Sequence, residues 1–387
     1  DGPACTDALR RLGFEVHAAG ADQLDATPPS ARADVTREID VIEEILRLVG
    51  YEHVAPALPG LRQAPGVRAR DRGDAARAAL AAAGASEAIT YAFQALPRCL
   101  ALGLPPTDRR AQPIALRNPM SVDQAVMRTS LLPNLIAAIA RNHSHGRPDV
   151  ALFEVGSVFL RRDAGMTEQP VHELADEPLW AAGVLAGRRP AAIGHGAGYD
   201  AFDAKALALA AVRAVAGELP VRVDAVRDVP YLHPGVAGAL RARVDGGRDE
   251  VVGWFGEVHP AVRARLGVEV PVFAFEVALD RLPIAPPAQM RPIPRFPAST
   301  RDVSLLLAAA IPAARVLDII DEVAEPLVHR IALLEDYRDA KLGEGNKSML
   351  WSIAYRAADR TLTDAEVDHA HERIVARLLE LLPAQRR

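Results

Sequence analysis

The sequence has few cysteines and no long apolar segment, and each scarcity excludes a class of protein. Cys5 and Cys99 are the only cysteines in 387 residues, too few for a disulfide scaffold or a cysteine-based metal site, as expected in a reducing cytosol. No apolar run reaches the roughly 18 residues that indicate a membrane span. The chain opens on polar Asp1, without a secretory signal or an initiator methionine. We therefore expect a cytoplasmic protein without a membrane segment, cut from a longer polypeptide.

The charge composition argues against a protein that holds nucleic acid through an overall positive field. The formal net charge is −5, whereas nucleic-acid-binding domains usually carry a basic surface. Only three of the 45 basic residues are lysines (Lys205, Lys341 and Lys347), which we attribute to codon usage. We expect no DNA partner, although a local basic patch for RNA stays possible.

Composition and patterning predict an α+β protein of several domains. Half of the residues are apolar and a quarter are charged, which is typical of soluble globular proteins with about 100–200 residues in each domain. The predicted parts are a small helix-rich domain (1–60), a core of mixed helices and strands (61–283), a proline-rich linker (284–294) and a compact terminal domain (295–387).

The small domain contains one strongly amphipathic segment. Apolar residues recur at helical spacing between Val35 and Val49, which predicts a helix, and Gly50 stands where a C-terminal cap is expected. A shorter helix is predicted at Thr6–Leu12, before a turn at Pro28 and Pro29.

The predicted core alternates alanine-rich helices with short strands, which favours a sheet covered by helices. The predicted helices are Asp74–Ala83, Leu131–Asn142 and Ala204–Ala216, and the predicted strands are Val150–Phe159, Trp180–Leu185, Leu240–Val244, Val251–Val258 and Val272–Val277.

The terminal domain has the element order βαββα, with a short strand possible at its end. The predicted elements are strand Asp302–Leu307, helix Ala313–Ala324, strands His329–Tyr337 and Ser348–Arg356, a helix starting in a capping box at Thr363 and Glu366, and a stub at Ala384–Arg387. This order predicts a ferredoxin-like domain.

Four carboxylates form the sharpest candidate site. Asp40, Glu43 and Glu44 lie at i, i+3 and i+4, so a helix presents them side by side, and Asp34 can fold back from the preceding turn. Such oxygen ligands suit Mg²⁺ or Ca²⁺. We call these four residues the acidic set. The alternative is a solvated acidic helix face in which one aspartate caps the helix.

Five basic residues of the terminal domain are candidates for RNA contact because they fall near strand ends and turns: Arg295, Arg301, Lys347, Arg356 and Arg360. The domain's slightly negative charge is a weak electrostatic signal, and Arg301 could instead pair with its neighbour Asp302. Tyr337, Trp351 and Tyr355 could stack on bases from the sheet. Trp351 and Tyr355 share one face of their strand, but the sequence does not tell which face is buried.

Several sequence segments resemble the C-terminal part of bacterial phenylalanyl-tRNA synthetase beta subunits, and they follow the family's order along nearly the whole chain. The segments are LGFEV (12–16), PSARADVTREIDVIEEILRLVGY (29–51), GASEAITYAF (84–93), LRNPMSVDQAVMRTSLLPNLI (116–136), ALFEVGSVF (151–159), YLHPGVAG (231–238), GWFGEVHP (253–260), RFPASTRDVSLLL (295–307), EDYRDAKLGEGNKSMLWSIAYR (335–356) and DRTLTDAEV (359–367). Ala31 stands where the family usually has an aromatic residue. The family's N-terminal tRNA-binding-like and editing domains have no counterpart among these segments.

The resemblance implies a degenerate class II synthetase-like core with a mixed or antiparallel sheet and a ferredoxin-fold anticodon-binding domain. It implies that the acidic set binds Mg²⁺ shared with an alpha subunit, within an (αβ)₂ heterotetramer that charges tRNA(Phe). ATP and phenylalanine would be used in the alpha subunit. The core lacks the arginines that a class II site needs for ATP: Phe153-Glu154-Val155 stands where an Arg-x-Glu would. We therefore expect the chain alone to be inactive.

Two alternatives stay open. The chain could be a free-standing RNA-binding or regulatory paralogue, which co-purification with an alpha subunit would distinguish. It could also be an independent enzyme, but this requires a nucleotide-binding arginine pair or an activated nucleophile, and the sequence presents neither.

Overall fold

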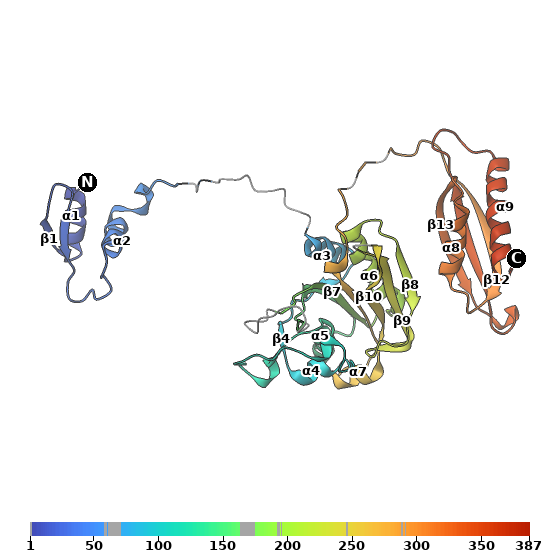
Figure 1. The fold of residues 1–387 in the computed structure, drawn as a ribbon, viewed down its shortest axis with the longest axis horizontal. Coiled ribbons are helices and arrows are strands. Elements are labelled where there is room, and N and C mark those ends of the chain that lie inside the picture. The colour runs from blue at the N-terminus through green and yellow to red at the C-terminus, as the bar shows by residue number, and fades with distance from the viewer. Residues whose placement is uncertain are drawn as a thin grey trace. The chain divides into compact units, whose positions relative to one another are not determined.

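The computed structural model describes residues 2–57, 60, 71–162, 175–191, 194, 196–244, 247–287, 289–290 and 292–387. Its contacts divide the chain into two units, 1–68 and 69–387 (Figure 1). None of the described helices is long and apolar enough to cross a membrane. The predicted domain limits at 60, 283 and 294 stay predictions.

The first unit is a small α+β fold. Its elements are α1 (Gly2–Arg11), β1 (Glu15–Ala18), β2 (Leu24–Thr27), α2 (Glu38–Val49) and the short 3-10 helix η1 (Tyr51–His53), with β1 and β2 antiparallel. Four buried side chains form its core, Leu9, Phe14, Val16 and Val35. So small a core can contribute little stability by apolar burial alone.

The amphipathic helix of this unit is confirmed, with a later start than predicted. α2 begins at Glu38 instead of Val35. At its other end the Gly50 N–H donates to the carbonyl oxygen of Leu46 at 2.8 Å, with φ of 109°. Glycine adopts this left-handed region without steric cost, so the predicted cap is confirmed.

The second unit contains a mixed sheet in the order β3-β6-β7-β11-β10-β9-β8. β3 and β6 are parallel, and the other neighbours are antiparallel. The strands are β3 (Ser86–Glu87), β6 (Val150–Ser157), β7 (Leu179–Ala186), β8 (Val221–Ala225), β9 (Leu232–Arg243), β10 (Asp249–Val258) and β11 (Val272–Ala278). β9 begins eight residues before the predicted strand, because the strand continues through His233 and Pro234, where the sequence pattern indicates a turn.

Helices cover both faces of this sheet. α3 (Arg72–Ala82) and α6 (Ala201–Ala216) pack on one face. α5 (Leu132–Ser144) and α7 (Pro260–Arg265) pack on the other, with the residues that follow α4 (Leu96–Leu100). A small ladder of β4 (Phe93–Gln94) and β5 (Val126–Met127) and the 3-10 helices η2 (Arg109–Ala111), η3 (Val122–Gln124) and η5 (Leu279–Arg281) complete this part. The predicted sheet with helical cover is confirmed.

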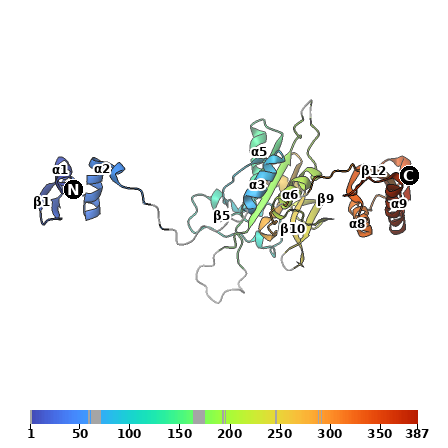
Figure 2. The same cartoon turned by 90° about the horizontal axis from the view of Figure 1, so that it is seen from above.

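The terminal domain has the predicted ferredoxin-like topology. Its antiparallel sheet has the order β13-β14-β12-β15. The elements are β12 (Ser299–Ala308), α8 (Ala313–Val323), β13 (Val328–Tyr337), η6 (Ala340–Leu342), β14 (Asn346–Tyr355), α9 (Asp364–Leu381) and β15 (Ala384–Arg386). α8 and α9 lie next to each other and pack on one sheet face (Figure 2). Thr363 and Glu366 form the predicted capping box of α9.

Candidate functional site

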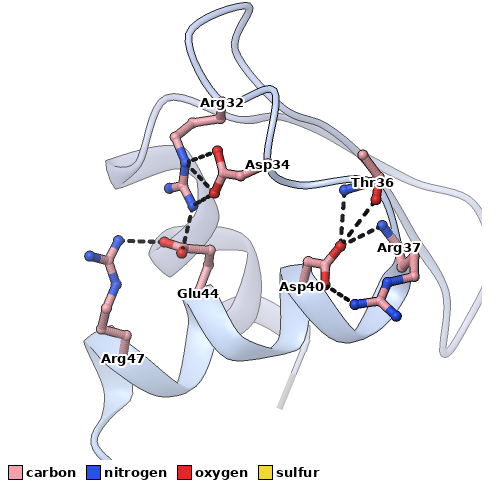
Figure 3. A network of polar contacts seen from close by, with 7 residues as sticks. All are labelled: Arg32, Asp34, Thr36, Arg37, Asp40, Glu44 and Arg47. Carbon is pink, nitrogen blue, oxygen red and sulfur yellow. Dashed lines mark hydrogen bonds and ion pairs between the residues drawn. The ribbon is translucent and has the colours of Figure 1, made fainter. Parts of the chain in front are cut away.

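Asp40 is bonded to the start of its own helix. One carboxylate oxygen, Oδ2, accepts the backbone N–H groups of Thr36 at 3.0 Å and Arg37 at 2.9 Å, and Oδ1 accepts from the Arg37 guanidinium at 3.1 Å (Figure 3). These bonds lower the pKa of Asp40. They also satisfy N–H groups that a helix start leaves without partners. Asp40 therefore has the capping role that the alternative to a metal site required.

Asp34 and Glu44 are joined by one guanidinium. Arg32 Nη2 lies 2.7 Å from Asp34 Oδ2 and 2.7 Å from Glu44 Oε1, and Arg32 Nε donates to Asp34 Oδ1 at 2.9 Å (Figure 3). Arg47 bonds the second oxygen of Glu44. Glu44 is buried at 7% exposure, and hydrogen bonds from Arg32 and Arg47 outweigh that burial and hold its pKa at about 2.

The acidic set does not converge on one point in this arrangement. Glu43 is exposed, and it makes no polar contact that the described residues show. Across those residues, no group of three or more His, Cys, Asp or Glu side chains could hold a metal ion. The donor chemistry suits Mg²⁺, but the arrangement does not fit it, because Arg32 and the helix cap already use three of the four carboxylates.

Three of the five predicted RNA-contact residues form ion pairs within the terminal domain. Arg301 bonds Asp364 at 2.8 Å and Asp368 at 2.7 Å, so it pairs with α9 instead of Asp302. Arg360 bonds Glu366 at 2.5 Å, within the capping box of α9. Lys347 is buried at 3% exposure, and its Nζ lies 3.3 Å from Asp336.

The other two predicted RNA-contact residues, Arg295 and Arg356, make fewer polar contacts. Arg295 is exposed and makes no polar contact within the described part of the chain. Arg356 contacts His329 through Nη1 at 3.1 Å, while its buried Nε has no partner among the described residues.

The sheet of the terminal domain has one covered and one open face. Trp351 and Tyr355 are buried under the helices, and the Tyr355 hydroxyl contacts His371 Nδ1 at 3.0 Å. They are therefore unavailable for stacking on bases, whereas Tyr337 is 40% exposed.

The open face is the side of this sheet turned away from α8 and α9. By strand register it carries Thr300, Asp302, Ser304 and Leu306 of β12, Leu350, Ser352 and Ala354 of β14, and Arg330 and Ala332 of β13. Arg330 is exposed and lies opposite Ala354, which pairs on its other side with Thr300 of β12. It was missed because it lies within a strand, and only the register assigns it to this face.

The buried carboxylates of the core are paired with hydrogen-bond donors of the same chain. Arg128 Nη1 and Thr90 Oγ1 lie 2.5 Å and 2.7 Å from the two carboxylate oxygens of buried Glu154. Glu276, fully buried, accepts the Ser130 hydroxyl at 2.5 Å, and burial raises its pKa. Both carboxylates already have donors, which is typical of structural charges that fix loops to a sheet.

One surface of the second unit is apolar and exposed. We define the apolar surface as Ile89, Tyr91, Phe93, Leu96, Leu100, Met120 and Val122, which are 39–94% exposed. These residues belong to neighbouring segments, because β4 pairs with β5 and packs beside η3, and α4 follows β4 directly. Exposed apolar side chains on neighbouring segments make this surface a candidate for protein contact.

The fold is a helix-covered mixed sheet followed by a ferredoxin-like domain, and comparison with known families assigns its parts to the tRNA synthetases. Residues 55–279 match the phenylalanyl tRNA synthetase beta chain CLM domain, 294–387 the ferredoxin-fold anticodon binding domain and 2–51 the tRNA synthetase B5 domain. The chain belongs to the phenylalanyl-tRNA synthetase beta chain family.

Individual relatives agree with this assignment. The chain is 42% identical over 387 residues to the phenylalanine–tRNA ligase beta subunit of Anaeromyxobacter dehalogenans, covering 98% of this chain and 46% of that protein. It is 38% identical over 394 residues to that of Moorella thermoacetica, with the same coverage. The chain thus spans about half the length of the curated relatives it matches.

Among solved structures, a pyrrolysyl tRNA synthetase from Desulfitobacterium hafniense has a TM-score of 0.40 and 14% identity, covering 55% of this chain and 66% of that one. This likeness is too distant to support a conclusion.

Proposed function

We propose that this chain acts as the non-catalytic beta component of a cytoplasmic phenylalanine–tRNA ligase. Identity of 42% over 98% of the chain to a named beta subunit carries the proposal. An alpha subunit activates phenylalanine with ATP and transfers it to tRNA(Phe), and this chain supports it in an (αβ)₂ heterotetramer. The internally matched charges of the core agree with a supporting role.

The terminal domain binds the tRNA in this proposal. Arg295 and Arg356 contact RNA together with Arg330, which the open face adds to the candidates. Arg301, Lys347 and Arg360 act by holding the ends of strands and helices in position. Tyr337 is the aromatic residue with an accessible ring for stacking on an unpaired base.

The apolar surface faces the alpha subunit in this proposal. A surface with exposed side chains such as Met120 at 94% and Val122 at 83% gains apolar burial from a partner protein. Arg98 and Arg117, close in sequence to Leu96, Leu100 and Met120, are exposed, which favours acidic groups on the partner surface.

Mg²⁺ belongs to the assembled enzyme in this proposal. The acidic set supplies hard oxygen donors, but three of its carboxylates are engaged within the chain. Ligation of an ion shared with the alpha subunit therefore requires that the partner rearrange this part of the small unit.

Co-purification with the alpha subunit of the same organism tests the proposal. We expect a stable complex with the wild-type chain, weakened at least about tenfold by Met120→Asp with Val122→Asp. Phe202→Asp is the matched control, since Phe202 is 74% exposed on α6, outside the apolar surface.

Failure of the wild-type chain to bind the alpha subunit would contradict the proposal. If it nevertheless bound RNA alone, the free-standing RNA-binding paralogue would become the better account. Equal weakening by the Phe202 control would reject only the assignment of the surface.

A further inference from the structure

The acidic set already contains a cation. The guanidinium of Arg32 lies between Asp34 and Glu44, at 2.7 Å from an oxygen of each. Asp34 lies in the loop before α2, and Glu44 lies in the second turn of α2. Arg32 therefore fixes this loop to the helix in the way that a bridging metal ion would.

The position of Arg32 and that of a bridging metal ion exclude each other. Mg²⁺ binds carboxylate oxygens at roughly 2.0–2.1 Å and demands octahedral geometry. An ion bridging Asp34 and Glu44 would have to occupy the space of Arg32 Nη2. It would also lie within a few Å of the Arg47 guanidinium on the other oxygen of Glu44, where two like charges repel strongly.

The remaining members of the acidic set, Asp40 and Glu43, do not provide an alternative metal site. The carboxylate of Asp40 accepts two backbone N–H groups at the helix start, which a metal ion would have to displace. Glu43 is exposed and provides at most one ligand side chain, which is too few for a site built only from protein.

We propose that Arg32 is the resident cation of the acidic set in the unpartnered chain, and that it closes this site to divalent metal ions until it is displaced. This inference rests on the proposed function only for the origin of the displacement: docking of the alpha subunit moves Arg32 away and exposes Asp34 and Glu44. The chain alone is thus held together here by a guanidinium, and Mg²⁺ occupancy becomes a property of the assembly.

Manganese binding to the full chain, followed by electron paramagnetic resonance in the absence of any partner, tests the proposal. The wild-type chain is expected to bind Mn²⁺ weakly. Arg32→Gln is expected to bind at least about tenfold more tightly, because it removes the guanidinium that lies between Asp34 and Glu44 and keeps the four carboxylates, while Arg47 is present in both proteins. Arg11→Gln is the matched control, since Arg11 is an exposed arginine of α1 in the same unit.

Arg32→Lys is a second variant, used in case Arg32→Gln fails to fold. Lysine keeps a positive charge but cannot make the two-pronged bond to Asp34, so its Mn²⁺ affinity should lie between those of the wild type and Arg32→Gln. A further measurement needs no variant: millimolar Mg²⁺ should protect the amides of α2 from hydrogen exchange no better than NaCl of equal ionic strength.

Two results would overturn the proposal. Tight Mn²⁺ binding by the wild-type chain, equal to that of Arg32→Gln, would mean that Arg32 does not close the site. Unchanged weak binding by Arg32→Gln and Arg32→Lys would mean that no latent site exists behind it. Neither result depends on whether the chain binds an alpha subunit, so failure here is distinguishable from failure of the proposed function.

Discussion

Two arginines in different parts of the molecule each bridge a pair of carboxylates, and their surroundings differ. Arg32 in the small unit and Arg301 in the terminal domain have side chains that are equally exposed, at 27%. The partners of Arg301 are exposed, at 88% for Asp364 and 59% for Asp368. One partner of Arg32, Glu44, has a side chain that is only 9% exposed.

The two arginines differ in importance because the two parts of the molecule have apolar cores of different size. The terminal domain has two helices and a four-stranded sheet around a broad apolar core, so the ion pairs of Arg301 with two exposed aspartates are additions on its surface, where such pairs contribute little. The small unit has a core of four buried apolar side chains. There the buried carboxylate of Glu44 depends on Arg32 and Arg47 together, and removing Arg32 leaves one of its two oxygens without a partner.

The largest expected effect lies in the terminal core. Trp351 is 1% exposed beneath the helices, so Trp351→Ala should lower the free energy of unfolding of this domain by about 3–5 kcal/mol. Chemical denaturation of the full chain measures it. Leu334→Ala, at a residue 57% exposed in the same domain, serves as control and should change stability by less than about 0.5 kcal/mol.

Substituting each of the two bridging arginines tests the comparison itself. Arg32→Gln should increase hydrogen exchange in α2 much more than Arg301→Gln increases it in α9, because only Arg32 serves a buried carboxylate. Hydrogen exchange of the full chain followed by mass spectrometry measures the amide protection of both helices in one experiment. Equal losses of protection in the two helices would contradict the contrast between the two arginines.

The pH dependence of the small unit follows from the same bridge. The pKa of Glu44 is lowered from 4.5 to about 2, so its stabilising contribution is complete above pH 4.5 and is lost as the pH falls towards about 2. Asp34 and Asp40 have lowered pKa values and act in the same direction. Protection of α2 should therefore decline over this window, and Arg32→Gln should flatten the decline.

The smallest expected effect concerns the helix caps. In α9 the Thr363 hydroxyl accepts the backbone N–H of Glu366, so Thr363→Ala should cost about 1 kcal/mol in chemical denaturation. In α2 the N-cap is Arg37, and the backbone N–H groups of Thr36 and Arg37 both donate to Asp40, whereas the Thr36 hydroxyl is 3.5 Å from the same carboxylate oxygen. Thr36→Ala should therefore cost less. A larger loss from Thr36→Ala would show that the two caps work differently from this description.

Local chemistry makes much of the fold predictable. The capping box at Thr363 and the glycine cap at Gly50 are encoded within a few neighbouring residues, and alternation along β14 assigns Trp351 and Leu350 to opposite faces of the strand. Short elements such as the β1–β2 hairpin were missed, because four-residue strands without a clear alternating pattern give no signal.

The candidate site was predictable in composition but not in pairing. Asp40 and Glu44 lie on one helix as expected, yet no sequence pattern joins Arg32 to Glu44, twelve residues away. Likewise the sequence allows Arg301 to pair with adjacent Asp302, while its partners lie 63 and 67 residues further along the chain. Such pairings depend on tertiary packing, which spacing along the sequence does not contain.

The most direct test of the proposed function is an aminoacylation time course with purified alpha subunit, phenylalanine, ATP and tRNA(Phe), with and without this chain. We predict that charging requires the chain and is reduced by Arg356→Gln with Arg295→Gln. Charging by the alpha subunit alone at the same rate, or no charging after a stable complex has formed, would contradict the proposed function.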